Sequence, residues 1–150
     1  MAPITVSTEV ARSPADAFGY VTDPSRFAEW QQGVVSGHMD GSGPPTVGDK
    51  CVTTRRIGRS ERLVTSELTH IDPPRTWGVR GLDGPIRAQV DVTVTPLDES
   101  TRSRVTIELE FTGHGVGKIL VPLVVRPSAR KEMDANIERL RSQLESSGTT

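Results

Sequence analysis

The stretch SPADAFGYVTDPSRFAEW, residues 13–30, repeats one short pattern twice. In each half a residue that can cap a helix stands before a proline, first as Ser13–Pro14 and then as Asp23–Pro24, and apolar residues follow three apart. Serine and aspartate accept hydrogen bonds from the free N–H groups of a first helical turn. Proline suits the position after the cap because its missing N–H would be unpaired there. The stretch therefore predicts two short helices in tandem.

Strand patterns surround these helices. Residues 4–10 (ITVSTEV) alternate between a mostly apolar face and a polar face, which predicts a strand with one solvent-exposed side. A short strand at 34–39 precedes a Gly/Pro/Ser-rich cluster at 40–49 that cannot be regular structure. Further along the chain, turn-forming residues separate five more strand-like segments. These segments are 50–57, 61–71, 76–82, 86–97 and 103–111.

The last two strands alternate most cleanly. Between 86 and 94 every second residue is apolar, and the same holds from 105 to 111. Strands of this kind build an antiparallel sheet with one buried face. The apolar positions are Ile86, Ala88, Val90, Val92, Val94, Val105, Ile107, Leu109 and Phe111.

The C-terminal part of the chain changes to a helical period. One apolar stripe has spacings of four, three and four residues, which predicts an amphipathic helix. Upstream, 119–125 is apolar on every side but contains Pro122, and Pro127 follows, so we expect a kink or an interruption there. Residues 145–150 are expected to form a frayed tail. The stripe consists of Met133, Ile137, Leu140 and Leu144.

This order of elements predicts the architecture. A six- or seven-stranded sheet with one apolar face needs a cover, and the C-terminal helix is the only predicted element long enough to provide it. We therefore expect one α+β domain over residues 1–150, in which a curved antiparallel sheet wraps around the long helix. The two short helices would fill the space between the sheet edge and that helix.

Composition excludes several classes of protein. The chain has 150 residues, which fits one domain, and a formal net charge of -1, which gives no general reason to expect nucleic acid or an anionic membrane as a partner. The single cysteine, Cys51, excludes an internal disulfide and suits a reducing cytoplasm. The start of the chain lacks an export-signal pattern, and the apolar run at 119–125 is too short to cross a bilayer. We expect a cytoplasmic protein without stable membrane insertion.

No cofactor or metal is expected. His38, His70 and His114 lie in separate segments, and no pair has the spacing of metal ligands. The sequence contains no G-x-S-x-G element. His70 and Glu67 point to opposite faces of a regular strand, so they could act together only if the strand bulges. We interpret His70 as a strand-edge histidine beside a turn.

Three segments and the terminal helix resemble a known superfamily. The segments are VSTEVARSPADAFGYVTDPSRFAEW at 6–30, VGDK at 47–50 and IDPPRTW at 71–77. Together they resemble the helix-grip superfamily SRPBCC, which includes START lipid-transfer domains, birch-pollen allergen relatives and bacterial polyketide cyclases. The resemblance covers nearly the whole chain. It implies a large cavity between the sheet and the long helix that usually holds an apolar small molecule.

The resemblance also suggests where a ligand would bind. Trp30 ends the second short helix just before 32–49, where the cavity of these proteins usually opens, and Trp77 lies in a strand facing the cavity. Cyclases of this superfamily place arginine, tyrosine and acidic or histidine groups in the cavity, for which Tyr20, Arg56 and Arg80 are the candidates. The predicted ligand-binding residues are Tyr20, Trp30, Arg56, Trp77, Val79, Val92, Ile107, Leu109, Phe111, Leu120 and Val124.

Two points stay open at the level of sequence. Arg55 and Arg56 are neighbours in a strand, so one of them must face solvent. The segment 118–126 is either the buried first half of the long helix or a mobile apolar gate, flanked by Lys118 and Arg126.

The sequence favours a binding protein for a hydrophobic small molecule, lipid-like or polyketide-like. A polyketide cyclase or dehydratase that uses the same cavity is the first alternative. A regulatory or antitoxin-like partner protein is the second. Catalysis needs converging titratable groups, and the sequence pairs no acid with Arg56, Arg80 or Tyr20.

Overall fold

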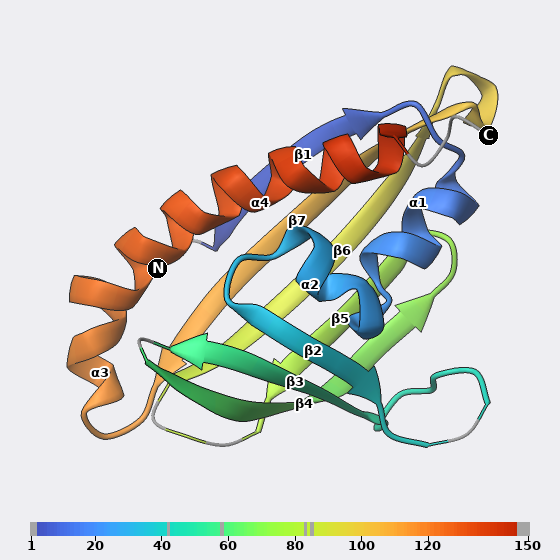
Figure 1. Cartoon of the computed structure of the whole chain (residues 1–150). Helices are drawn as coiled ribbons and strands as arrows, with labels where there is room; N and C mark the ends of the chain where they lie inside the picture. Colours follow the sequence, from blue (N-terminus) through green and yellow to red (C-terminus); the bar gives the residue numbers. More distant parts are fainter. Residues whose placement is uncertain (1–2, 42, 58, 83, 85, 147–150) are drawn as a thin grey trace.

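The computed structural model of the chain describes residues 3–41, 43–57, 59–82, 84 and 86–146. Within this part, seven antiparallel strands form one sheet in the order β1-β7-β6-β5-β4-β3-β2. The long helix α4 (Arg126–Ser146) lies across one side of the sheet, which curls around it (Figure 1). The strands are β1 (Ile4–Val10), β2 (Val34–Met39), β3 (Lys50–Ile57), β4 (Ser60–Asp72), β5 (Thr76–Gly81), β6 (Ile86–Leu97) and β7 (Arg102–Gly113).

The segment between β1 and β2 carries the chain from one edge of the sheet to the other. It contains α1 (Pro14–Val21), a 3₁₀ turn η1 (Pro24–Arg26) and α2 (Phe27–Trp30). Both predicted caps are confirmed. Ser13 Oγ accepts a hydrogen bond from the backbone N–H of Asp16 at 3.2 Å, and Asp23 Oδ1 accepts one from that of Ser25 at 3.0 Å. The second predicted helix is a 3₁₀ turn followed by one α-helical turn.

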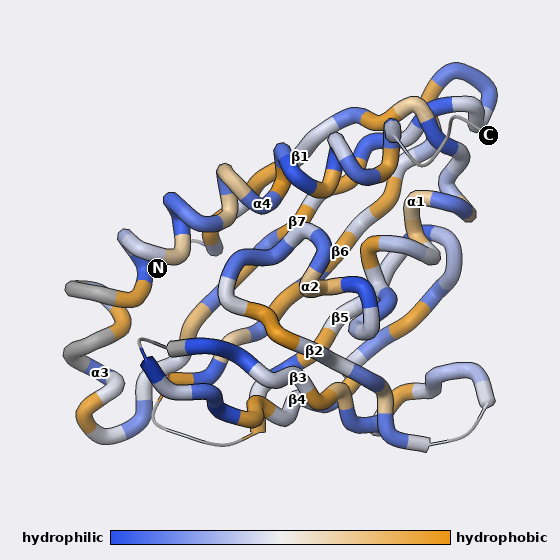
Figure 2. Tube along the Cα trace, viewed as in Figure 1, coloured by the Kyte–Doolittle hydropathy of each residue, from blue (hydrophilic) through white to orange (hydrophobic). Residues whose placement is uncertain are grey.

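The two sheet faces differ as the alternation predicts. The side chains of Val92, Val94 and Val105 are buried on the inner face, and those of Thr93 and Glu108 are exposed on the outer face. The predicted stripe of α4 is buried as well. Figure 2 shows hydrophobic and hydrophilic positions following each other along this helix. Burying one such aliphatic side chain contributes about 1.5–3 kcal/mol, so the buried stripe of α4 contributes substantially to stability.

The helix is irregular where its prolines predict. A short helix α3 (Gly117–Leu120) is followed by a π-helical turn η3 (Val121–Val125) that contains Pro122, and α4 begins one residue before Pro127. A proline removes a helical hydrogen-bond donor, and inserted turns of this kind often accompany that loss. The helix continues through Ser146, and the rest of the expected tail, 147–150, lies outside the described residues. No helix in the described ranges has the length and apolarity that a membrane crossing requires.

Candidate ligand-binding site

The apolar inner face of the sheet is closed at one end and open at the other. Among the apolar register pairs that β6 and β7 form on this face, the two closer to the β6–β7 turn are buried, with each side chain at most 8% exposed. The next two pairs, toward α3, are only partly buried. In order, the pairs are Val94–Val105, Val92–Ile107, Val90–Leu109 and Ala88–Phe111. The apolar side chains near α3 are therefore less completely buried than those near the β6–β7 turn.

The arrangement of the helices explains this difference. Helix α1 contacts β6 and β7 at the closed end, beside the C-terminal part of α4. At the open end β7 leads directly into α3 (Figure 1). The predicted site residues Leu120 and Val124 belong to this region, but their side chains lie outside the described part of the structure. Whether 118–126 is a gate therefore stays a prediction.

Three aromatic rings extend from α2 to the sheet. The ring of Phe27 is in edge-to-face contact with Trp30 at 5.9 Å and with Trp77 at 6.2 Å between centroids. Trp77 is 3% exposed, as expected for the inner face, but Trp30 is 5% exposed and belongs to the core rather than to a rim. Trp30 is buried in the core because the segment η1–α2 packs its apolar side onto the sheet. Predicted residue Val79 is buried beside them.

Trp30 brings an unsatisfied polar group into this core. Its indole Nε1 is buried and has no hydrogen-bond partner among the described residues. Leaving a buried donor unpaired costs about 1–3 kcal/mol. Most buried polar groups are paired, so this N–H is an unfavourable feature of the core.

The two neighbouring arginines of β3 face opposite ways. Cys51 and Thr53 are buried on the inner face, and Arg55 follows them at the same spacing. Arg55 Nη2 donates a hydrogen bond to Gln31 Oε1 at 3.4 Å, next to the end of α2. Arg56 is 64% exposed on the outer face, where it pairs with Glu61 at 3.9 Å. The structure thus places Arg55, and not the predicted Arg56, on the inner side.

The environment of Arg55 is poorly suited to a charge. Burial lowers the pKa of the Arg55 guanidinium, and the Glu132 carboxylate on α4 opposes that shift through space. Its hydrogen bond to Gln31 uses one of the five N–H donors of a guanidinium. Sequence alternation limited the choice to Arg55 or Arg56, and only the pairing of β3 with β4 decides between them.

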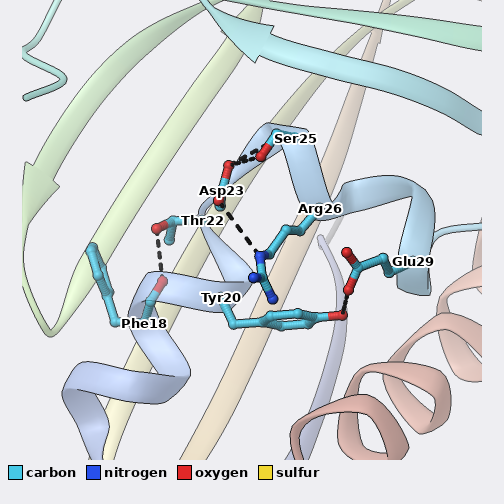
Figure 3. Close-up of polar contacts among 7 residues, drawn as sticks. All are labelled: Phe18, Tyr20, Thr22, Asp23, Ser25, Arg26 and Glu29. Carbon is cyan, nitrogen blue, oxygen red and sulfur yellow. Dashed lines mark hydrogen bonds and ion pairs between the residues drawn. The ribbon is translucent and has the colours of Figure 1, made fainter. Parts of the chain in front are cut away.

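Tyr20 lies at the other end of the molecule from Arg55, and its side chain already contacts other residues. Its hydroxyl donates a hydrogen bond to Glu29 Oε1 at 2.9 Å, and the Arg26 guanidinium lies 5.4 Å from the centre of its ring (Figure 3). Burial, and then the contact with Glu29, raises the pKa of Tyr20. The ring borders a hollow of about 410 Å³ beside Leu144 of α4. The predicted cluster of Tyr20 with Arg56 or Arg80 is therefore not assembled.

The remaining polar candidates lie on the outer face of the sheet. Arg80 pairs with Glu67 at 3.5 Å. The register of β4 shifts between Leu68 and His70, and His70 contacts Asp91 rather than Glu67. Among the described residues, no three His, Cys, Asp or Glu side chains gather as metal ligands would. The inner face therefore carries both a partly exposed apolar surface and the guanidinium of Arg55.

Comparison with known proteins identifies the family. The chain belongs to the family described as polyketide cyclase / dehydrase and lipid transport, whose model matches residues 1–145. No curated protein sequence matches the chain. The predicted resemblance to the START-like superfamily is confirmed.

Solved structures show the same fold at low sequence identity. TTHA0849 from Thermus thermophilus is similar with a TM-score of 0.75 and 12% identity, over 98% of this chain and 99% of that chain. A START superfamily protein from Mycobacterium smegmatis is similar with a TM-score of 0.71 and 12% identity, over 97% and 99%. The Zhui aromatase/cyclase from Streptomyces sp. R1128 is similar with a TM-score of 0.69 and 14% identity, over 99% and 98%. These likenesses establish the helix-grip fold.

Proposed function

We propose that the protein binds an apolar small molecule, lipid-like or polyketide-like, against the open part of the inner sheet face. The supporting observation is the change in burial along β6 and β7, where Val90, Leu109 and Phe111 are partly exposed on the side that α4 covers. Removing apolar surface from water contributes about 25 cal/mol per Å². Small-molecule sites are concave and mostly apolar, and the description of the family includes lipid transport.

An enzyme of the cyclase or dehydratase type is the second candidate. Arg55 favours it, because a guanidinium beside an apolar surface can stabilise the negative oxygen of an enolate. Glu132 is the carboxylate whose charge acts on Arg55, and it would serve as the acid or base. Binding is the primary proposal because it requires only the open apolar surface.

Substitution on one strand tests the binding site. Phe111→Asp would place a carboxylate on the open inner face, whereas Thr112→Asp would place one on the exposed outer face of the same strand. We expect native mass spectrometry to detect dodecanoate or an aromatic polyketide bound to the wild type and to Thr112→Asp. Phe111→Asp should bind neither, because burying a charge against an apolar ligand is costly. A wild type that stays unliganded with both probes would refute the proposal.

A further inference from the structure

The ladder between β3 and β4 pairs its charges in two different ways on its two faces. On the outer face each cation lies opposite an acid: Lys50 is the register partner of Glu67 and binds it at 3.2 Å, and Arg56 is the partner of Glu61 at 3.9 Å. On the inner face, between those two pairs, Arg55 is the register partner of Arg62. The same two strands therefore match opposite charges outside and like charges inside.

A like-charge pair in this position is unfavourable by itself. Residues directly opposite on one face of an antiparallel pair have Cβ atoms about 4.5–5.5 Å apart, and like charges there are destabilising. Within the described ranges, neither Arg55 nor Arg62 forms an ion pair with a carboxylate. Glu132 acts on Arg55 only through space. On the inner face of this ladder two arginines are thus register partners, and neither has the acid that faces each outer cation.

The pair lies on the same concave face of the sheet as the open apolar surface. The hydrogen bond from Arg55 to Gln31 and the influence of Glu132 on α4 both show that its side chain extends to the concave side. Along the same face of β4, Arg62 is followed by Val64, which is partly buried, and further on by Leu68, which is fully buried. From Leu68 the register crosses β5 and β6 to Leu109 on β7.

We propose that Arg55 and Arg62 bind the anionic head group of the ligand, so that this protein takes apolar molecules that carry a carboxylate or a similar small oxyanion. This inference rests on the proposed binding function. Arginine forms bidentate hydrogen bonds with such groups. A head group between the two guanidinium groups would turn their repulsion into attraction, and it would accept hydrogen bonds that the described residues leave unused. The apolar part of the ligand would then lie along the inner face toward Leu109.

Two amphiphiles of equal chain length test the inference. The affinities of dodecanoate and of 1-dodecanol are measured by tryptophan fluorescence for the wild type, for the double variant Arg55→Gln/Arg62→Gln and for Arg56→Gln. The outer-face Arg56→Gln is the control, because it makes the same kind of substitution at the position next to Arg55. We expect the wild type and the control to bind dodecanoate at least tenfold more tightly than 1-dodecanol. The double variant should lose that preference and keep its affinity for 1-dodecanol.

The outcomes separate the two proposals. Equal binding of the two amphiphiles by the wild type would overturn the anion site and leave the proposed function intact. A preference for dodecanoate that persists in the double variant would also overturn it. If neither amphiphile binds the wild type, the proposed function is wrong and the inference is lost with it. Circular dichroism of each variant confirms that the fold is retained, and dodecyl phosphate replaces dodecanoate to show whether the site also accepts a phosphate.

Discussion

His70 and Asp91 meet across the backbone of Gly78. His70 Nε2 lies 2.7 Å from Asp91 Oδ1, although their strands, β4 and β6, do not pair with each other. The strand between them contributes Gly78, which is the register partner of both residues. A Cβ at this position would meet His70 Nε2 and would lie 2.7 Å from Asp91 Oδ1. The missing side chain therefore makes the contact possible.

Gly78→Ala should destabilise the protein by roughly 1–3 kcal/mol, because the added methyl group must displace His70 or Asp91. Urea unfolding measures the change. Gly19→Ala provides the control: nothing lies within 4 Å of a Cβ there, and the residue belongs to α1, so that substitution should stabilise. A Gly78→Ala variant as stable as the wild type would mean that His70 and Asp91 separate at no cost.

Trp30→Ala should cost roughly 3–5 kcal/mol, as expected for a buried aromatic side chain. From its position in the sequence, Trp30 is expected at the rim of the cavity, where its removal would cost less stability than the removal of Trp77. However, both indoles are at most 5% exposed and both contact Phe27. Urea unfolding of Trp30→Ala and Trp77→Ala compares them directly. Trp30→Phe should cost less than Trp30→Ala, because it keeps a ring and removes the unpaired N–H. A loss of stability below about 1 kcal/mol in Trp30→Ala would show that Trp30 lies at the rim of the cavity rather than in the core.

Local patterns predicted the fold because they report on single elements. Strand alternation has a period of two, so the apolar face of β6 and β7 can be read directly from the sequence. The caps at Ser13 and Asp23 involve contacts two or three residues away. The same locality explains why the sequence predicts the family, the sheet and the long helix.

The polar part of the site depends on pairing between strands, which alternation does not encode. β3 reads KCVTTRRI, and its polar residues occupy both faces, so the pattern cannot assign Arg55 or Arg56 to the inside. The register with β4 makes that assignment. His70 and Asp91 are 21 residues apart, and their contact depends on the irregular register of β4.

The thiol of Cys51 should make stability depend on pH in the alkaline range. Burial raises the pKa of Cys51 to about 11, compared with about 8.5 in an unfolded chain. Between these values the unfolded chain has released the proton that the folded chain keeps, so the free energy of unfolding should fall as the pH rises. Urea unfolding at about pH 8 and about pH 10 measures this slope. Cys51→Ala should have a shallower slope, and an unchanged slope would show that another group causes it.

Arg62→Glu should make the protein more stable and less selective for anions. The substitution would place a carboxylate opposite Arg55 and replace repulsion by attraction, with an expected gain of about 0.2–1 kcal/mol in urea unfolding. The same carboxylate would repel the head group of dodecanoate, so the preference over 1-dodecanol should disappear.

Arg56→Glu is the mirror control for that variant. On the outer face it would put two acids opposite each other at Glu61, so stability should fall while the preference for dodecanoate stays. The two substitutions make the same change of charge on opposite faces of one ladder. We expect opposite effects on stability, and a loss of selectivity in Arg62→Glu alone. If Arg62→Glu lowers the free energy of unfolding, the two guanidinium groups do not repel each other in the free protein. The argument that an anionic ligand compensates for their proximity would then lose its basis.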